Sequence, residues 1–222
     1  MRFDLVTFDA YSALVDYRGS LLPVVESIPG LDKRHASELL ELWRARQLGI
    51  ATLSNALDRG RISFRECTAL ALDYVLGRHG LRVNGDTRET LVGAWYALDP
   101  WPEANQVLAA VKARGYRLAI LSNGDQDMLE ALAGGFDTPF DDILSSEQCG
   151  LYKPHPRVYA LPSRELGIER YLHVAGSPND AMGAAAAGVD CYWSNRLGDT
   201  VLLPQYAPRA QGPDLGGLLG LL

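Results

Sequence analysis

The sequence predicts an α/β fold, in which a doubly wound parallel sheet carries a helical insertion after its first strand. Three observations support this fold class. Short apolar, β-prone runs recur along the 222 residues, and each ends in small or polar residues, as buried parallel strands do. Helical patterns lie between these runs. One long segment, residues 15–98, contains several helical patterns and no β-type run, so it stands outside the alternation.

The predicted strands are four apolar runs: Leu5–Phe8, Arg117–Leu121, Tyr171–Ala175 and Val189–Trp193. Three helical patterns lie between the strand runs, and each has a glycine just past its last periodic residue. They are Glu103–Arg114, Asp125–Ala133 and Asn179–Ala187. Glycine in that place ends a helix because it adopts positive φ without a Cβ clash. In a sheet of this kind ligands bind beyond the carboxyl ends of the strands, at the point where the strand order reverses.

The inserted segment is predicted as a mostly helical cap. Its helical stretches are His35–Leu48, Leu53–Leu57, Phe64–His79 and Thr87–Tyr96. The two prolines of Asp99-Pro100-Trp101-Pro102 cannot continue a helix and mark the return to the core. The predicted domains are therefore a core of residues 1–14 and 99–222 and a cap of residues 15–98. The Gly-rich tail, Leu215–Leu222, is either a short docking segment or a frayed end.

Composition excludes several classes of protein. The formal net charge is −6, with no cluster of Lys and Arg, so no nucleic-acid partner is expected. The amino terminus lacks the layout of a signal peptide, and no apolar stretch is long enough to span a membrane. Cys67, Cys149 and Cys191 are odd in number and widely spaced, as reduced thiols in a cytoplasmic protein would be.

Four polar motifs follow the predicted core elements, and each has an ordinary explanation when taken alone. Asp9 after the first strand is a turn residue or helix cap. Ser122-Asn123 caps the helix that starts near Asp125. Lys153 is a solvated lysine, and Asp180 is an acidic residue in a first helical turn. Their order, spacing and common position at one edge of the sheet are what is specific.

This series of Asp, Ser/Asn, Lys-Pro and a small-residue turn ending in Asp resembles the motifs of the haloacid dehalogenase superfamily from end to end. The resemblance implies a Rossmann-like core with a helical cap after the first strand. It also implies that Asp9 is a carboxylate nucleophile that forms a covalent ester, held in place by Lys153. Ser122 and Asn123, with backbone N–H groups at a helix start, would bind an anionic group of the substrate. Asp180 would orient Lys153 or activate the water that hydrolyses the ester.

Two positions separate this chain from the phosphatases of that superfamily. Tyr11 stands where phosphatases have the second Asp of their first motif, and a neutral phenol is a poor general acid. Gly176 stands where phosphatases have an Asp that binds magnesium directly. Asp9 and Asp180 alone are a thin ligand set for Mg²⁺. Both losses point away from metal-dependent phosphoryl transfer.

Other residues resemble the L-2-haloacid dehalogenase branch: Asp9-Ala10-Tyr11, Leu121–Gly124, Tyr152-Lys153-Pro154 with Arg157-Val158-Tyr159, and Leu42–Leu48 in the cap. The resemblance implies that Arg44 receives the leaving halide or holds the substrate; the alternative is an exposed helix arginine. Predicted substrate contacts are Tyr11, Leu48, Phe64, Asn123, Tyr159 and Ser177. A plain core aromatic is an equal explanation for Phe64.

The sequence departs from that branch at three positions. Family dehalogenases have Gly-Thr where this chain has Ser12-Ala13, Ser in place of Ala175 and Asn in place of Ser177. The lost side chains support the nucleophile, the lysine and the water, so uncompensated losses would slow the reaction. Ser12 and Ser177 are neighbouring hydroxyls that could compensate.

The favoured function is a metal-independent (S)-2-haloacid dehalogenase that acts on a small 2-substituted carboxylic acid and gives a D-2-hydroxy acid. No cofactor is then required. The alternatives are a phosphatase with degenerate motifs, which would need Mg²⁺, and a non-catalytic binding protein. The expected partner is a small anionic substrate. Related dehalogenases often form homodimers through the cap, but the residues themselves leave the oligomeric state open.

Overall fold

The structure is a computed structural model that describes residues 3–222, and the chain divides into two compact units. One unit contains the chain up to Val15 together with Pro100–Leu222. The other contains Asp16–Asp99. Each unit has its own core, and each is described by itself.

The first unit is built on a six-stranded parallel sheet with the strand order β3-β2-β1-β4-β5-β6. The strands are β1 (Leu5–Phe8), β2 (Arg117–Ser122), β3 (Asp142–Ser145), β4 (Tyr171–Ala175), β5 (Asp190–Ser194) and β6 (Ala210–Gly212). The order runs outward from β1 in both directions, which confirms the predicted doubly wound α/β class. The strands β3 and β6 were not predicted, because neither is a continuous apolar run.

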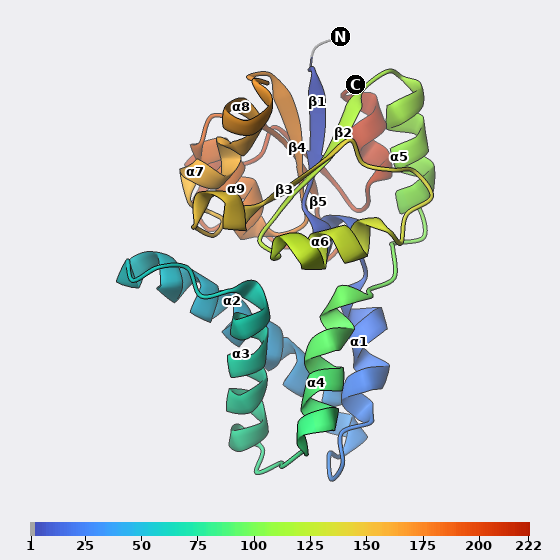
Figure 1. Cartoon of the computed structure of the whole chain (residues 1–222). Coiled ribbons are helices and arrows are strands. Elements are labelled where there is room, and N and C mark those ends of the chain that lie inside the picture. Colours follow the sequence, from blue (N-terminus) through green and yellow to red (C-terminus); the bar gives the residue numbers. More distant parts are fainter. Residues whose placement is uncertain (1–2) are drawn as a thin grey trace. The chain divides into compact units, whose positions relative to one another are not determined.

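Helices cover both faces of this sheet (Figure 1). The helices α5 (Ala104–Ala113) and α6 (Gln126–Ala133) lie on one side, and α7 (Pro156–Tyr159), α8 (Leu161–Leu166) and α9 (Pro178–Ala186) lie on the other. Short helical turns complete the unit: η1 (Ala10–Leu14), η4 (Ser146–Cys149), η5 (Pro204–Tyr206) and η6 (Gly216–Gly220). Leu215 and Leu218 are fully buried, so the tail docks on the core and is not frayed.

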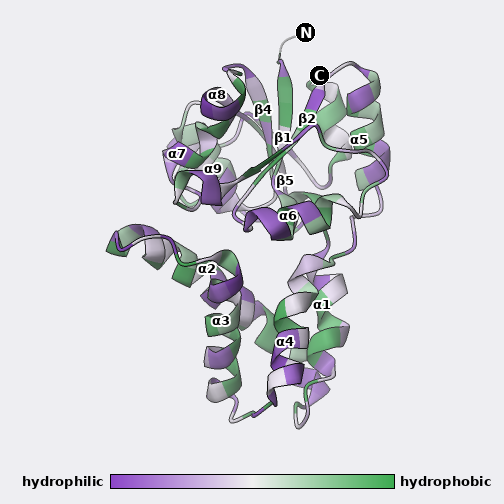
Figure 2. Ribbon diagram, viewed as in Figure 1, coloured by the Kyte–Doolittle hydropathy of each residue, from purple (hydrophilic) through white to green (hydrophobic). Residues whose placement is uncertain are grey.

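The sheet face beneath α7, α8 and α9 is an apolar layer. Its members come from every central strand and from the covering helices: Leu5, Ala119, Leu121, Tyr171, Ala175, Cys191, Trp193, Val158, Leu161, Ala181 and Ala184. Strand β1 is mostly hydrophobic (Figure 2). Thr7 and His173 lie side by side on this face, because they are register partners between β1 and β4. They place a polar pair inside an otherwise apolar layer.

The second unit is helical, with α1 (Tyr17–Glu26), α2 (Ala36–Leu57), α3 (Phe64–Arg78) and α4 (Gly85–Gly93). The short turns η2 (Lys33–His35) and η3 (Ala94–Tyr96) precede α2 and follow α4. Helix α2 is one continuous element where the sequence predicted two stretches, and α1 was not predicted. In the core of this helical unit Trp43 and Trp95 pack edge to face, with 5.5 Å between their ring centroids. Across residues 3–222, no helix is both long and apolar enough to cross a bilayer.

Candidate active site

Asp9 follows β1 directly, at the point where the strand order reverses. Its backbone N–H donates to the Val174 carbonyl at 2.9 Å, which extends the β1–β4 pairing by one residue. The chain then enters the π-helical turn η1, and Asp9 Oδ2 accepts the Ser12 N–H at 3.2 Å. Asp9 is therefore a turn cap as well as a site residue. The residue is 8% exposed, and its Oδ1 accepts hydrogen bonds from two other predicted site residues, Ser122 and Lys153.

Lys153 lies between two buried carboxylates. Its Nζ is 3.3 Å from Asp9 Oδ1 and 3.0 Å from Asp180 Oδ2, and the residue is only 7% exposed. The backbone N–H of Lys153 donates to Asn123 Oδ1 at 2.8 Å, which fixes the loop that carries it. The explanation of Lys153 as a solvated lysine is therefore wrong.

Asp180 lies in the first turn of α9, where Ser177 is the N-cap and accepts the Asp180 N–H at 3.3 Å. Its Oδ1 accepts the hydroxyl of Tyr159 at 2.8 Å. Although burial alone would raise the pKa of Asp180, the nearby Lys153 and His173 lower it well below its usual range. The carboxylate is thus held in its charged form. Ser177 and Tyr159, which were predicted as substrate contacts, both bond to Asp180.

Ser122 and Asn123 do not cap α6. The Ser122 hydroxyl donates to Asp9 Oδ1 at 2.9 Å, and the Asn123 side chain holds the backbone of Lys153. The N–H groups of Gln126 and Met128 in α6 donate to the carboxylates of Glu147 and Asp127. The predicted anion site at this helix start therefore does not include these two N–H groups.

The sequence did not single out His173 or Thr7, yet both belong to the cluster. His173 Nε2 lies 3.2 Å from Lys153 Nζ and 3.1 Å from Asp180 Oδ2, while its Nδ1 lies 2.8 Å from Thr7 Oγ1. The imidazole is fully buried. Burial lowers its pKa, and Lys153 acts in the same direction, against the opposing effect of Asp180. The available signal was a histidine within an apolar strand run.

Gly176 packs against the backbone of η1. A Cβ at this position would lie 2.2 Å from the Ala13 nitrogen and 2.3 Å from the Ser12 carbonyl carbon. An aspartate could not be accommodated here without moving that turn, so the phosphatase magnesium ligand does not fit this loop. Among residues 3–222, no group of three or more His, Cys, Asp or Glu side chains is arranged to hold a metal ion.

Three predicted site residues belong to the helical unit. Arg44 is 9% exposed, its Nη1 donates to Gln47 Oε1 at 2.6 Å, and its guanidinium lies over the rings of Tyr17 and Trp95. It is therefore not an exposed helix arginine. Phe64 is fully buried at the start of α3, and Leu48 is half-buried on α2. Tyr11 belongs to the core unit, where it is buried in η1.

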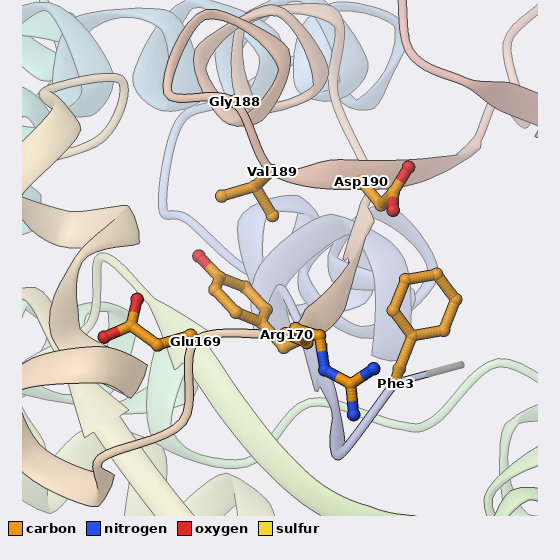
Figure 3. A pocket seen from close by; sticks show the side chains of 7 residues that line it. Phe3, Glu169, Arg170, Gly188, Val189 and Asp190 are labelled. Carbon is orange, nitrogen blue, oxygen red and sulfur yellow. The ribbon is translucent and has the colours of Figure 1, made fainter. Parts of the chain in front are cut away.

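A pocket of about 240 Å³ lies at the opposite edge of the sheet, where β1, β4 and β5 begin (Figure 3). Its lining residues are Phe3, Glu169, Arg170, Tyr171, Gly188, Val189 and Asp190. Its charged groups have protein partners, since Arg170 pairs with Asp4 and Asp190 pairs with Arg209. This pocket is separate from the Asp9 cluster.

Known proteins resemble the chain over most of its length. A family model described as haloacid dehalogenase-like hydrolase matches residues 3–188. The (S)-2-haloacid dehalogenase of Pseudomonas sp. (strain YL) is 34% identical over 87% of this chain and 83% of its own length. Haloacetate dehalogenase H-2 of Moraxella sp. (strain B) is 33% identical over 89% of this chain and 88% of its own. The L-2-haloacid dehalogenase of Xanthobacter autotrophicus with chloropropionic acid covalently bound superposes with a TM-score of 0.84 at 28% identity, over 99% of this chain and 98% of that one.

Proposed function

Because the chain belongs to the haloacid dehalogenase-like hydrolase family, we propose that it is a dehalogenase that converts small (S)-2-haloacids into 2-hydroxy acids through an ester on Asp9. The observation that carries the proposal is the buried cluster in which Asp9 accepts the Ser122 hydroxyl and the Lys153 ammonium. The two curated relatives are named an (S)-2-haloacid dehalogenase and a haloacetate dehalogenase. A related structure holds chloropropionic acid covalently.

Asp9 is suited to attack because its two oxygens are held differently. Oδ1 accepts from Ser122 and Lys153, whereas Oδ2 accepts the Ser12 N–H. Three donors on one carboxylate fix its orientation, so little positional freedom is lost when a substrate arrives. Oδ2 is the less heavily bonded oxygen and attacks the carbon that bears the halogen. A C–O bond forms as the carbon–halogen bond breaks, and the halide leaves with the bonding electron pair.

Asp180 acts through Lys153 on this account. It already accepts hydrogen bonds from Lys153 and Tyr159, and its lowered pKa makes it a weak base. Orientation of Lys153 is therefore the better supported of the two roles considered for Asp180. Lys153 in turn keeps Asp9 oriented and balances its charge during the first step.

The second step regenerates the enzyme. Water adds to the Asp9 side-chain carbonyl carbon, and the bond between that carbon and the substrate oxygen breaks. The product leaves as a hydroxy acid with one of the original Asp9 oxygens, one water oxygen stays on Asp9, and one proton passes to solvent. Attack opposite the halide inverts the substrate carbon, which gives the D-2-hydroxy acid.

No metal or cofactor takes part in this mechanism. Gly176 leaves no room for a carboxylate ligand, and the Lys153 ammonium lies where Asp9 and Asp180 converge. The predicted role of Arg44 with the halide or substrate, and those of Leu48, Phe64 and Tyr11 around the substrate side chain, stay predictions. Cytoplasmic location and a homodimer also stay predictions.

Chloride release from L-2-chloropropionate in EDTA tests the proposed function. We expect turnover by the wild-type protein and none by Asp9→Asn. An Asp190→Asn variant is the matched control, because Asp190 lies at the opposite edge of the same sheet, where its side chain pairs with Arg209. Absence of chloride release above the Asp9→Asn background, or magnesium-dependent hydrolysis of p-nitrophenyl phosphate instead, would refute the proposal.

A further inference from the structure

His173 occupies an unusual position for a polar side chain. It is the central residue of β4, is fully buried, and faces the apolar layer under α7 and α9. A buried imidazole is costly unless both ring nitrogens have hydrogen-bond partners. Thr7, its register partner on β1, is the neighbour of Nδ1, and the carboxylate of Asp180 is a neighbour of Nε2. The polar pair is therefore connected directly to the catalytic cluster.

The distances favour one arrangement of protons on the imidazole. Nε2 faces both Asp180 oxygens, at 3.2 and 3.1 Å, and a protonated nitrogen attracts a carboxylate. Nδ1 is then the acceptor, and the Thr7 hydroxyl donates to it at 2.8 Å. With this tautomer Lys153 and His173 both donate to Asp180 Oδ2, which accounts for the 3.2 Å between Nζ and Nε2. In this arrangement the Thr7 hydroxyl, both ring nitrogens of His173 and the Asp180 carboxylate each have a hydrogen-bond partner of the right kind.

We propose that Thr7 and His173 form a buried positioning pair, in which Thr7 fixes the imidazole and the imidazole fixes the Asp180 carboxylate that orients Lys153 toward Asp9. The inference rests on the proposed function for its kinetic consequences and on the hydrogen bonds alone for its structural ones. It also accounts for alanine at positions 13 and 175. The side chains of Ala13 and Ala175 cannot donate hydrogen bonds, and His173 supplies a side-chain donor to the same cluster from two residues before Ala175 on β4.

The pair works only while His173 is neutral. The titratable or charged groups that face the imidazole are Lys153, Asp180, Asp9, Tyr159 and Cys191. Protonation would place a second cation beside Lys153 and would remove the acceptor to which Thr7 donates. Protonation of His173 should therefore lower kcat at acid pH. Variants whose side chain at position 173 does not titrate should not show this loss.

Four variants separate positioning from simple packing. His173→Phe fills the space without a donor, whereas the side-chain amide of His173→Gln can donate near the Nε2 position and does not titrate. Thr7→Val is isosteric without the hydroxyl, and Thr7→Ser retains it. We expect His173→Phe to lower kcat about ten- to a hundred-fold with little change in KM. His173→Gln should recover most of kcat and lose the acid limb of the wild-type pH profile. Thr7→Val should lower kcat several-fold more than Thr7→Ser does.

Wild-type kcat for His173→Phe, a loss equally large in His173→Gln, or equal rates for Thr7→Val and Thr7→Ser would overturn the inference. Nitrogen NMR of the histidines gives a second readout that does not depend on the reaction. We expect a His173 signal of the Nε2–H tautomer at neutral pH, identified by its absence in His173→Gln. An Nδ1–H tautomer would overturn the inference even if chloride release is normal. Failure of the wild-type protein to release chloride would refute the proposed function and leave the tautomer test intact.

Discussion

Replacement of Lys153 by methionine removes the ammonium from between Asp9 and Asp180 and keeps an unbranched side chain of related shape. Lys153 Nζ lies 3.3 Å from Asp9 Oδ1 and 3.0 Å from Asp180 Oδ2, so these two oxygens are at most about 6 Å apart, where two unit charges repel by about 3 kcal/mol at an effective dielectric constant of about 20. Loss of one partner from a buried ion pair costs about 3–5 kcal/mol in measured cases. Both energies predict a large loss of stability and activity on removal of the ammonium.

Lys153→Met should therefore lower kcat by at least about a hundred-fold and destabilise the fold by a few kcal/mol. The matched control is Lys112→Met, because Lys112 forms its ion pair with Asp141 at the partly exposed edge of the core. Such a surface pair is worth at most about 1 kcal/mol. Chloride release and urea unfolding of the two variants measure both effects. A Lys153→Met enzyme with kcat within about three-fold of wild type, or no less stable than Lys112→Met, would refute the reasoning.

The other predictions concern single contacts of the same cluster. Ser122→Ala removes the hydroxyl that donates to Asp9 Oδ1, so kcat should fall about five- to a hundred-fold in chloride-release assays, and an unchanged kcat would contradict that role. Gly176→Ala should lower the melting temperature and abolish turnover, because its Cβ would lie 2.2 Å from the Ala13 nitrogen; the control Gly49→Ala has open space on α2, and equal stability of the two variants would show the clash to be absent. Burial lowers the pKa of His173, so the unfolded chain binds a proton that the folded chain excludes, and stability should fall as pH drops below about 6.5, by up to about 1.4 kcal/mol per pH unit. Urea unfolding at several pH values should show this loss in the wild type and a smaller one in His173→Gln, and identical pH slopes would count against it.

The central strands were predictable because burial on both faces requires continuous apolar runs, as in Leu5–Phe8 and Tyr171–Ala175. The edge strands β3 and β6 were not, since one begins with Asp142 and the other is Ala-Gln-Gly. Helix α1 was missed because Pro23 lies inside it, which argues locally against a helix. Its stability comes from tertiary burial of Leu21 and Val25, and a local pattern does not contain that information.

Four of the site residues were predictable from the sequence, but their contacts were not. Asp9, Ser122, Lys153 and Asp180 were predictable because motif order and strand ends place them at one edge, and the structure brings these four together. The partners of each side chain were not predictable. The Ser122 hydroxyl bonds to Asp9 because it lies at the end of β2, beside the end of the neighbouring strand β1.

His173 could not be assigned from sequence for a related reason. It is one polar residue within Tyr171–Ala175, a strand that is buried along its whole length, so its polarity alone does not show which groups it contacts. Only the register that pairs it with Thr7, and the placement of α9 above both, brings the imidazole to Asp180. Long-range register decides this contact, and a histidine within an apolar strand run does not by itself reveal its partners.

Isotope transfer to Asp9 is the most direct test of a covalent mechanism. A single turnover of L-2-chloropropionate in heavy-oxygen water, followed by mass spectrometry of the peptide that contains Asp9, locates the incoming oxygen atom. If Asp9 is the nucleophile, the heavy oxygen appears on the Asp9 carboxylate and the hydroxy acid from that turnover carries ordinary oxygen. Heavy oxygen in the hydroxy acid and none on Asp9 would mean that water attacks the substrate directly, and would contradict the mechanism proposed for this site.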